Sequence, residues 1–209
     1  KQEEMCGITH YLVDILEPVQ DFSVVLFQQY AKQAIEQIRA KGKIPIMVGG
    51  TGFYIQSVLY DIDFQDSMAD DSLRKELEET ARQQGAEYLH HILEQCDPQA
   101  AAQIHANNMK RVIRAIEFYR QTGTKISEHN TIEREKQSAY NSFYFVLTDT
   151  RSRLYENIDK RVDSMIEKGL TDEVKKLIEM GCKRNSTAMQ GLGYKEIYDY
   201  LSGECTLDE

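Results

Sequence analysis

The chain lacks the sequence features that mark several protein classes. None of its apolar runs approaches the ~20 residues that a membrane-spanning helix needs, and no secretory signal is recognisable. Its four cysteines lie far apart without a CxxC pair, and its five histidines form no HExxH motif. We therefore expect a cytoplasmic protein with structural thiols, without a membrane segment and without a metal site built from these side chains.

Positive charge is scarce as well, with 25 Lys and Arg against 34 Asp and Glu, a formal net charge of -9. On its own this balance argues against a nucleic-acid binder. Residues 107–125 are the exception, because they hold five basic residues and one acid. Lys110, Arg111 and Arg114 cluster opposite the apolar stripe of the helix predicted there, where they would suit a phosphate backbone or a diphosphate. A solvated basic face, or pairing with acidic neighbouring helices, fits the same pattern.

The order of predicted elements indicates an α/β fold, a parallel-sheet core that carries an all-helical insertion domain. Short apolar segments at 44–48 and 142–148 are typical of strands, and residues 8–15 of a strand or an extended segment. Pro and Gly bound the segment 44–48 like a buried parallel strand. Between residues 66 and 139, caps and apolar periodicity predict successive helices and no strand. The predicted parts are 1–64 (core), 65–139 (helical insertion) and 140–209 (return strand and C-terminal helices).

Three glycines fall within four positions where the second predicted strand ends: Gly49, Gly50 and Gly52, with Thr51 between them. A helix is predicted to follow, and a helix N-terminus presents unpaired N–H groups that attract phosphate. Glycine lets backbone N–H groups approach an anion closely, and Thr51 adds a hydroxyl donor. The stretch therefore suits a phosphate or diphosphate, or else a tight strand-to-helix turn. It is not a Walker A loop, because no Lys-Ser/Thr follows.

Two later stretches also carry polar groups that could bind a ligand. Arg161 lies beside the apolar stripe of a helix predicted over 151–168, a pattern that favours a structural salt bridge. In residues 190–195, Gln190 could contact a base edge, Tyr194 could stack on a base and Lys195 could neutralise phosphate. An ordinary glycine-containing turn before a tyrosine-rich helix fits this second stretch equally well.

Taken together and in this order, five stretches resemble the bacterial tRNA dimethylallyltransferases (tRNA isopentenyltransferases). They are HYLVDILEP (10–18), PIMVGGTGFYIQSVLYD (45–61), NNMKRVIRAIEFYRQTG (107–123), RVDSMIEKGLTDEVKKLIEMG (161–181) and AMQGLGYKEIYDYLSGE (188–204). The resemblance implies a P-loop-kinase-like core whose helical insertion grips a tRNA anticodon stem-loop. It also implies transfer of the dimethylallyl group of dimethylallyl diphosphate to N6 of the adenosine 3′ of the anticodon, with release of diphosphate and usually with Mg²⁺.

The same resemblance implies roles for individual residues. Thr51 matches a threonine of the reaction channel, near both the diphosphate and the target adenosine. Arg161 matches an arginine that holds the diphosphate, together with the glycine turn. Arg74 matches a residue that contacts tRNA. The remaining tRNA-contacting positions are Lys110, Arg111, Val112, Ile113, Arg114, Gln190, Gly191, Leu192, Gly193, Tyr194 and Lys195.

The sequence departs from the family pattern in three places. The phosphate loop GxxxxGK[ST], the aspartate expected to act as general base and the basic C-terminal stretch are not found in these 209 residues. We therefore expect a longer parent protein, a monomer whose Mg²⁺ ligands lie mainly in the missing N-terminal segment, and we expect these residues alone to be inactive. The alternatives are an adenylate isopentenyltransferase, a non-catalytic tRNA-binding module and a small-molecule kinase.

Overall fold

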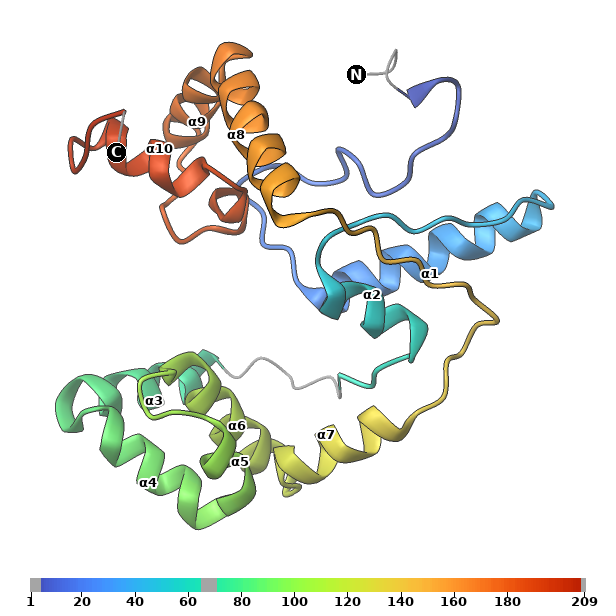
Figure 1. Ribbon diagram of the computed structural model, residues 1–209. Helices are drawn as coiled ribbons and strands as arrows, with labels where there is room; N and C mark the ends of the chain where they lie inside the picture. The colour runs from blue at the N-terminus through green and yellow to red at the C-terminus, as the bar shows by residue number, and fades with distance from the viewer. Residues whose placement is uncertain (1–4, 65–70, 208–209) are drawn as a thin grey trace. The chain divides into compact units, whose positions relative to one another are not determined.

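The computed structural model describes residues 5–64 and 71–207, whose regular elements are helices joined by irregular segments (Figure 1). The chain divides into two compact units, one formed by residues 48–141 and the other by residues 1–47 together with 142–209. The first unit contains α2 (Gly52–Leu59), α3 (Asp71–Gln84), α4 (Ala86–Cys96), α5 (Pro98–Gln103), α6 (Met109–Thr122) and α7 (Ile126–Glu135). The second contains α1 (Val24–Ala40), α8 (Arg151–Glu167), α9 (Leu170–Glu179), the 3₁₀ helix η2 (Thr187–Gln190) and α10 (Tyr194–Leu201).

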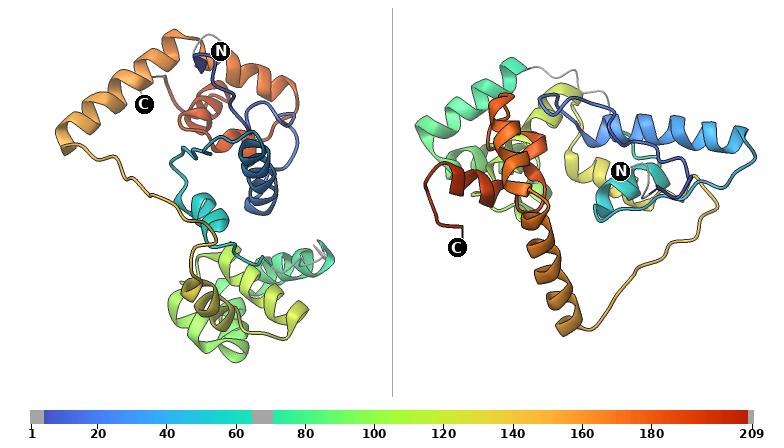
Figure 2. Two further views of the ribbon diagram at one scale, coloured as in Figure 1. Left: turned by 90° about the vertical axis from the view of Figure 1, so that its right-hand side faces the viewer. Right: turned by 90° about the horizontal axis from the view of Figure 1, so that it is seen from above.

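Apolar residues spaced three or four apart give the first unit its core. Helices α3, α4 and α6 pack on one another in pairs, and α5 lies against α4 (Figures 1 and 2). Each contributes one apolar stripe to a shared cluster, as amphipathic helices do. The fully or almost fully buried members include Leu77 of α3, Leu89 and Leu93 of α4, and Val112 and Ile116 of α6.

A buried carboxylate joins two helix N-termini in this unit. Asp97 is fully buried, caps α5 by accepting a hydrogen bond from the Ala100 amide at 3.0 Å, and also binds Ser127 in the first turn of α7. The Ser127 amide and hydroxyl donate to its oxygens at 2.9 and 2.7 Å. Burial alone would raise the pKa of Asp97, but hydrogen bonds from Ser127 and Ala100 outweigh it and lower the pKa below its ordinary value.

The second unit has a smaller core formed by its C-terminal helices. Leu170 and Val174 of α9 pack with Met189 of η2 and Ile197 of α10. An ion pair with two hydrogen bonds fixes α10 to the loop before η2, because Arg184 Nε and Nη2 donate to the two carboxylate oxygens of Asp199, each at 2.6 Å. The turn at residues 190–195 joins η2 to α10, so the packing of these two helices fixes both of its ends.

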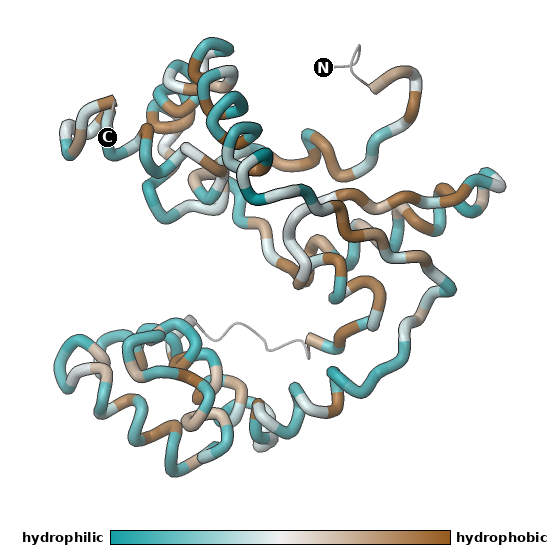
Figure 3. The backbone as a smooth tube through the Cα atoms, viewed as in Figure 1, coloured by the Kyte–Doolittle hydropathy of each residue, from teal (hydrophilic) through white to brown (hydrophobic). Residues whose placement is uncertain are grey.

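The three predicted strands do not form, so the parallel-sheet core is not confirmed. Segments 8–15, 44–48 and 142–148 are irregular, and the described part of the chain contains no strand. Their side chains are largely exposed, up to 89% for Val48 and 96% for Leu147, and Figure 3 shows apolar chain along these segments. The composition predicted strands, but a strand also needs a hydrogen-bonded neighbour, and none of the described segments pairs with these.

Candidate functional site

The glycine turn lies at the start of α2, and Thr51 is the N-cap of that helix. Thr51 has extended backbone angles, φ -88 and ψ 91, and its side chain makes no capping hydrogen bond. Its carbonyl accepts hydrogen bonds from the amides of Tyr54 and Ile55, so the backbone is already committed to α2. The hydroxyl and the four exposed residues 49–52 thus face solvent at a helix N-terminus.

Neither backbone conformation nor packing explains why glycine occupies three of these positions. Gly49, Gly50 and Gly52 are not among the glycines with positive φ, and a Cβ built on any of them would meet no atom within 4 Å. The described residues therefore give no support to the tight-packing explanation of the turn. The alternative, a ligand that approaches the backbone closely at these glycines, stays a prediction.

The basic segment of α6 combines exposed cations with buried apolar residues. Lys110 and Arg111 are exposed and Arg114 is half-buried. Val112 and Ile113 belong to the hydrophobic core, with exposures of 0% and 6%. Their side chains therefore cannot reach an RNA in this fold, so any contact through residues 110–114 depends on the three cations.

Arg74 of α3 is tied to α6. Its Nε donates to Glu117 Oε1 at 2.9 Å and its Nη2 donates to Glu117 Oε2 at 2.8 Å. The Arg74 side chain is 50% exposed, whereas that of Glu117 is only 3% exposed. Sequence reasoning counted Glu117 only as the single acid of a basic segment. Its role as partner of Arg74 was missed, because 43 residues separate the two in the chain.

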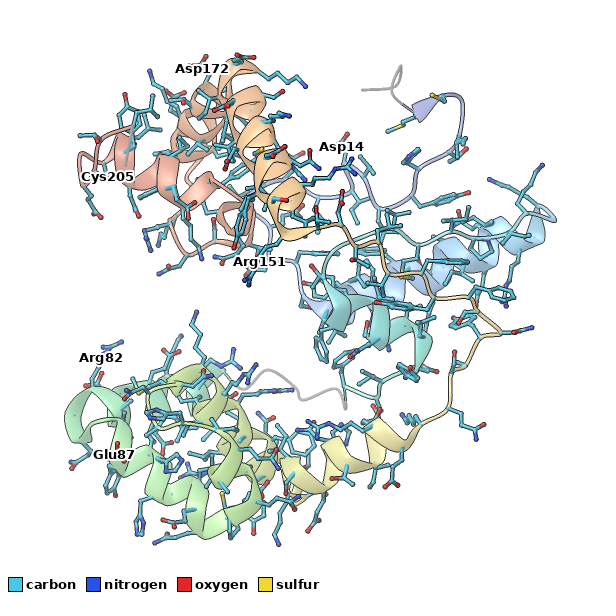
Figure 4. The ribbon with its side chains drawn as sticks, in the orientation of Figure 1. Asp14, Arg82, Glu87, Arg151, Asp172 and Cys205 are labelled. Carbon is cyan, nitrogen blue, oxygen red and sulfur yellow. The ribbon has the colours of Figure 1, made fainter. Side chains whose placement is uncertain are left out.

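Arg161 lies on the exposed part of α8, a helix with no buried residue that begins at the labelled Arg151 (Figure 4). Composition favoured a salt bridge for Arg161, but the ion pairs found among the described residues do not include it. Arg161 is therefore an accessible cation on α8.

The turn at residues 190–195 is held by its own side chains. A Cβ on Gly191 would lie 2.6 Å from the Tyr194 ring, and Gly193 has φ +85. The Tyr194 hydroxyl donates to Glu173 Oε1 at 2.7 Å; burial and this carboxylate raise the pKa of Tyr194 to about 12. Lys195 Nζ donates to Gln190 Oε1 at 2.6 Å. The Tyr194 hydroxyl is therefore bonded to Glu173, and its ring lies against Gly191. Leu192 is an exposed apolar residue of the turn.

The structure groups these positions by unit. Thr51, Arg74 and residues 110–114 belong to the unit of residues 48–141, and Arg161 and residues 190–195 belong to the other. The described residues contain no group of three or more His, Cys, Asp or Glu side chains that could hold a metal ion. Among the described helices, none has the length and apolar character needed to cross a membrane.

Comparison with known proteins identifies the family. A family model described as IPP transferase matches residues 1–209. The chain belongs to the IPP transferase family. The tRNA dimethylallyltransferase of Lachnoclostridium phytofermentans is 58% identical over 207 residues, 99% of this chain and 66% of that protein. The tRNA dimethylallyltransferase of Acetivibrio thermocellus is 50% identical over 208 residues, 100% of this chain and again 66% of the relative.

Solved structures give the same family. A full-length tRNA isopentenylpyrophosphate transferase from Bacillus halodurans matches with TM-score 0.64 and 43% identity, covering 100% of this chain and 64% of that one. A eukaryotic dimethylallyltransferase acting on tRNA matches with TM-score 0.80 and 29% identity, covering 98% and 52%. This IPP transferase chain thus has the fold of tRNA isopentenyltransferases at a coarse level, and spans 66% of the length of the curated relatives above.

Proposed function

We propose that this chain belongs to an enzyme that transfers a dimethylallyl group from dimethylallyl diphosphate to N6 of the adenosine on the 3′ side of a tRNA anticodon. Family membership over the whole chain supports the reaction class. The single structural observation that carries the proposal is the exposed turn at residues 49–52, where three glycines have neither a conformational nor a packing reason to be glycine.

The proposed chemistry is a displacement at an allylic carbon. The lone pair of N6 forms a bond to C1 of the dimethylallyl group, the C1–O bond breaks, and diphosphate leaves with the bonding electrons. One N6 proton is then lost to a base that we expect outside these residues. Negative charge on the leaving diphosphate grows during this step, so fixed hydrogen-bond donors and cations that face it accelerate the reaction.

The chain offers such groups at two places. The amides at the N-terminus of α2 and the Thr51 hydroxyl are directed to solvent from the glycine turn, which suits a diphosphate oxygen. Arg161, in the other unit, supplies an exposed guanidinium, which also suits a diphosphate. We assign Thr51 and Arg161 to diphosphate binding, with Thr51 as the group closest to the reacting bond.

The proposed acceptor is RNA, and the cations of the helical unit favour it. Lys110 and Arg111 are exposed on α6, and Arg74 is held beside that helix. We further assign Gln190, Leu192 and Lys195 of the 190–195 turn to contacts with the tRNA. A large acceptor explains why an enzyme of this chemistry would carry a separate helical unit with a basic face.

Substitution of Thr51 with alanine in the full-length enzyme tests the proposal. Loss of one donor to the leaving group lowers kcat by about 100-fold while the affinity for an anticodon stem-loop is kept. Thr150→Ala is the matched control, because Thr150 is also an exposed N-cap threonine that makes no side-chain capping bond. Equal turnover in the two variants would remove Thr51 from the mechanism.

The acceptor is tested separately with the wild-type enzyme. Transfer of a labelled dimethylallyl group to an anticodon stem-loop should exceed transfer to AMP at equal concentration. Preference for AMP would indicate a nucleotide isopentenyltransferase, and consumption of ATP without prenyl transfer would indicate a kinase.

A further inference from the structure

Three positions of α6 lie along one line of the helix surface. Lys110, Arg114 and Glu117 are separated by four and three residues, so they share a face, about 6 Å and 10.5 Å along the axis from the first to the others. Lys110 is exposed and Arg114 is half-buried, so this line begins with two positive charges. At its third position the sequence places an acid, which would break a row of cations built for a phosphate backbone.

The structure covers the acid at this third position with a cation from α3. Glu117 is 2% exposed, and a buried carboxylate is costly unless a cation and hydrogen bonds accompany it. Arg74 supplies both from α3 through two hydrogen bonds of 2.9 and 2.8 Å. Half of the Arg74 side chain stays exposed over the covered acid. Solvent therefore meets a guanidinium where the sequence of α6 alone would predict a carboxylate.

The two-pronged geometry fixes this guanidinium as well as neutralising the acid. A planar guanidinium bound at two of its nitrogens to one carboxylate has a defined orientation, which a single hydrogen bond would not impose. An unrestrained arginine loses side-chain entropy when it binds a phosphate. An arginine that the fold already holds in place loses less side-chain entropy when it binds a phosphate.

We propose that Glu117 is a positioning residue for RNA binding, which fixes Arg74 so that Lys110, Arg114 and Arg74 form one row of positive charge. The row suits the phosphate backbone of an RNA strand, whose charges also repeat at regular intervals. This inference rests on the proposed function and adds to it the buried acid that orders the surface. The competing explanation is a clamp between α3 and α6 that affects stability alone.

The test is a double-mutant cycle in the full-length enzyme with Glu117→Gln, Arg74→Met and the double variant. Kd for an anticodon stem-loop is measured at several salt concentrations, with kcat, KM and thermal unfolding measured alongside. We expect Glu117→Gln to weaken binding by about 5- to 10-fold and to raise KM, with kcat at saturating RNA unchanged. The slope of log Kd against log salt concentration should fall by an amount that corresponds to at most about one phosphate contact.

The cycle separates the two explanations. If Glu117 acts through Arg74, Glu117→Gln has no further effect on Kd in the Arg74→Met background. Additive losses in Kd, or a lower Tm with unchanged Kd and salt slope, would overturn the inference. Should Glu117→Gln fail to fold, Arg74→Lys keeps the charge without the two-pronged geometry; weaker binding would support the inference, and unchanged binding would overturn it.

Two controls complete the experiment. Glu76→Gln removes another ion pair between the same helices, in which Arg120 Nη1 lies 3.4 Å from Glu76 Oε1 and both side chains are well exposed. Glu76→Gln should leave Kd unchanged. An equal loss of affinity in this variant would show that the effect of Glu117→Gln comes from helix packing alone. Failure of the proposed function would look different, because the wild-type enzyme would then transfer no prenyl group to the stem-loop.

Discussion

Replacement of Asp97 with alanine should destabilise the helical unit far more than an ordinary helix-cap substitution. The change removes the cap of α5 and leaves two donors of Ser127, the amide and the hydroxyl, without their acceptor in a site where Ser127 is 7% exposed. Loss of the cap costs about 1 kcal/mol, and each stranded donor costs about 1–2 kcal/mol. The sum, about 3–5 kcal/mol, is a large share of the ~5–15 kcal/mol that stabilises a typical domain.

Hydrogen exchange of the α6 amides measures this loss in the helical unit alone. Amides that exchange only through opening of the unit should exchange at least about 100-fold faster in Asp97→Ala than in the wild type. Asn108→Ala is the control, because Asn108 caps α6 without a side-chain hydrogen bond. Similar exchange rates in the two variants would refute the role of Asp97 as the link between α5 and α7.

The lowered pKa of Asp97 adds a pH dependence to the same experiment. A carboxyl group with a depressed folded-state pKa stabilises the fold above its unfolded pKa of about 3.9, and this contribution is lost as pH falls through the folded value. Exchange in the wild type should therefore accelerate below about pH 4 relative to Asp97→Asn, which carries no titrating group. Parallel acid profiles would contradict the depressed pKa.

Three further predictions concern the glycine turns and Tyr194. Gly191→Ala should lower the Tm, because the new methyl group meets the Tyr194 ring at 2.6 Å, whereas Gly50→Ala should leave the Tm unchanged and reduce turnover, because its methyl group meets only a bound diphosphate. A Tm change in Gly50→Ala larger than in Gly191→Ala would refute both statements. Glu173→Gln should return the pKa of Tyr194 from about 12 toward 10, measured by NMR titration of the labelled ring, and an unchanged value would exclude Glu173 as a cause.

Local sequence signals predicted the helices closely. Ser23, a residue type that favours the N-cap position, is the N-cap of α1, and its hydroxyl oxygen accepts a hydrogen bond from the Leu26 amide at 3.3 Å. The helix predicted within residues 107–125 is α6, Met109–Thr122, with Gly123 in the left-handed conformation at its end. Helices are recognisable in this way because their hydrogen bonds and caps lie within a few residues of one another.

Features that join distant residues could not be predicted in the same way. The sheet was predicted from segments such as 44–48, whose composition indicates burial but cannot supply the neighbouring strand. The pairing of Arg74 with Glu117, and of Asp97 with Ser127, spans 43 and 30 residues. The residue types of the candidate site could be predicted from the sequence. The burial of Val112 and Ile113, and the hydrogen bond of Tyr194 to Glu173, could be found only in the structure.

The exposed segment at residues 142–148 has a consequence for the behaviour of the molecule in solution. Five large apolar residues follow one another there, Phe143, Tyr144, Phe145, Val146 and Leu147, with exposures from 59% to 96% and no charge among them. Uncharged apolar windows of this length with high β-propensity join edge to edge between copies and seed aggregates. In these 209 residues on their own, self-association through 142–148 should limit solubility, and a lysine at Phe145 should act as a gatekeeper that relieves it.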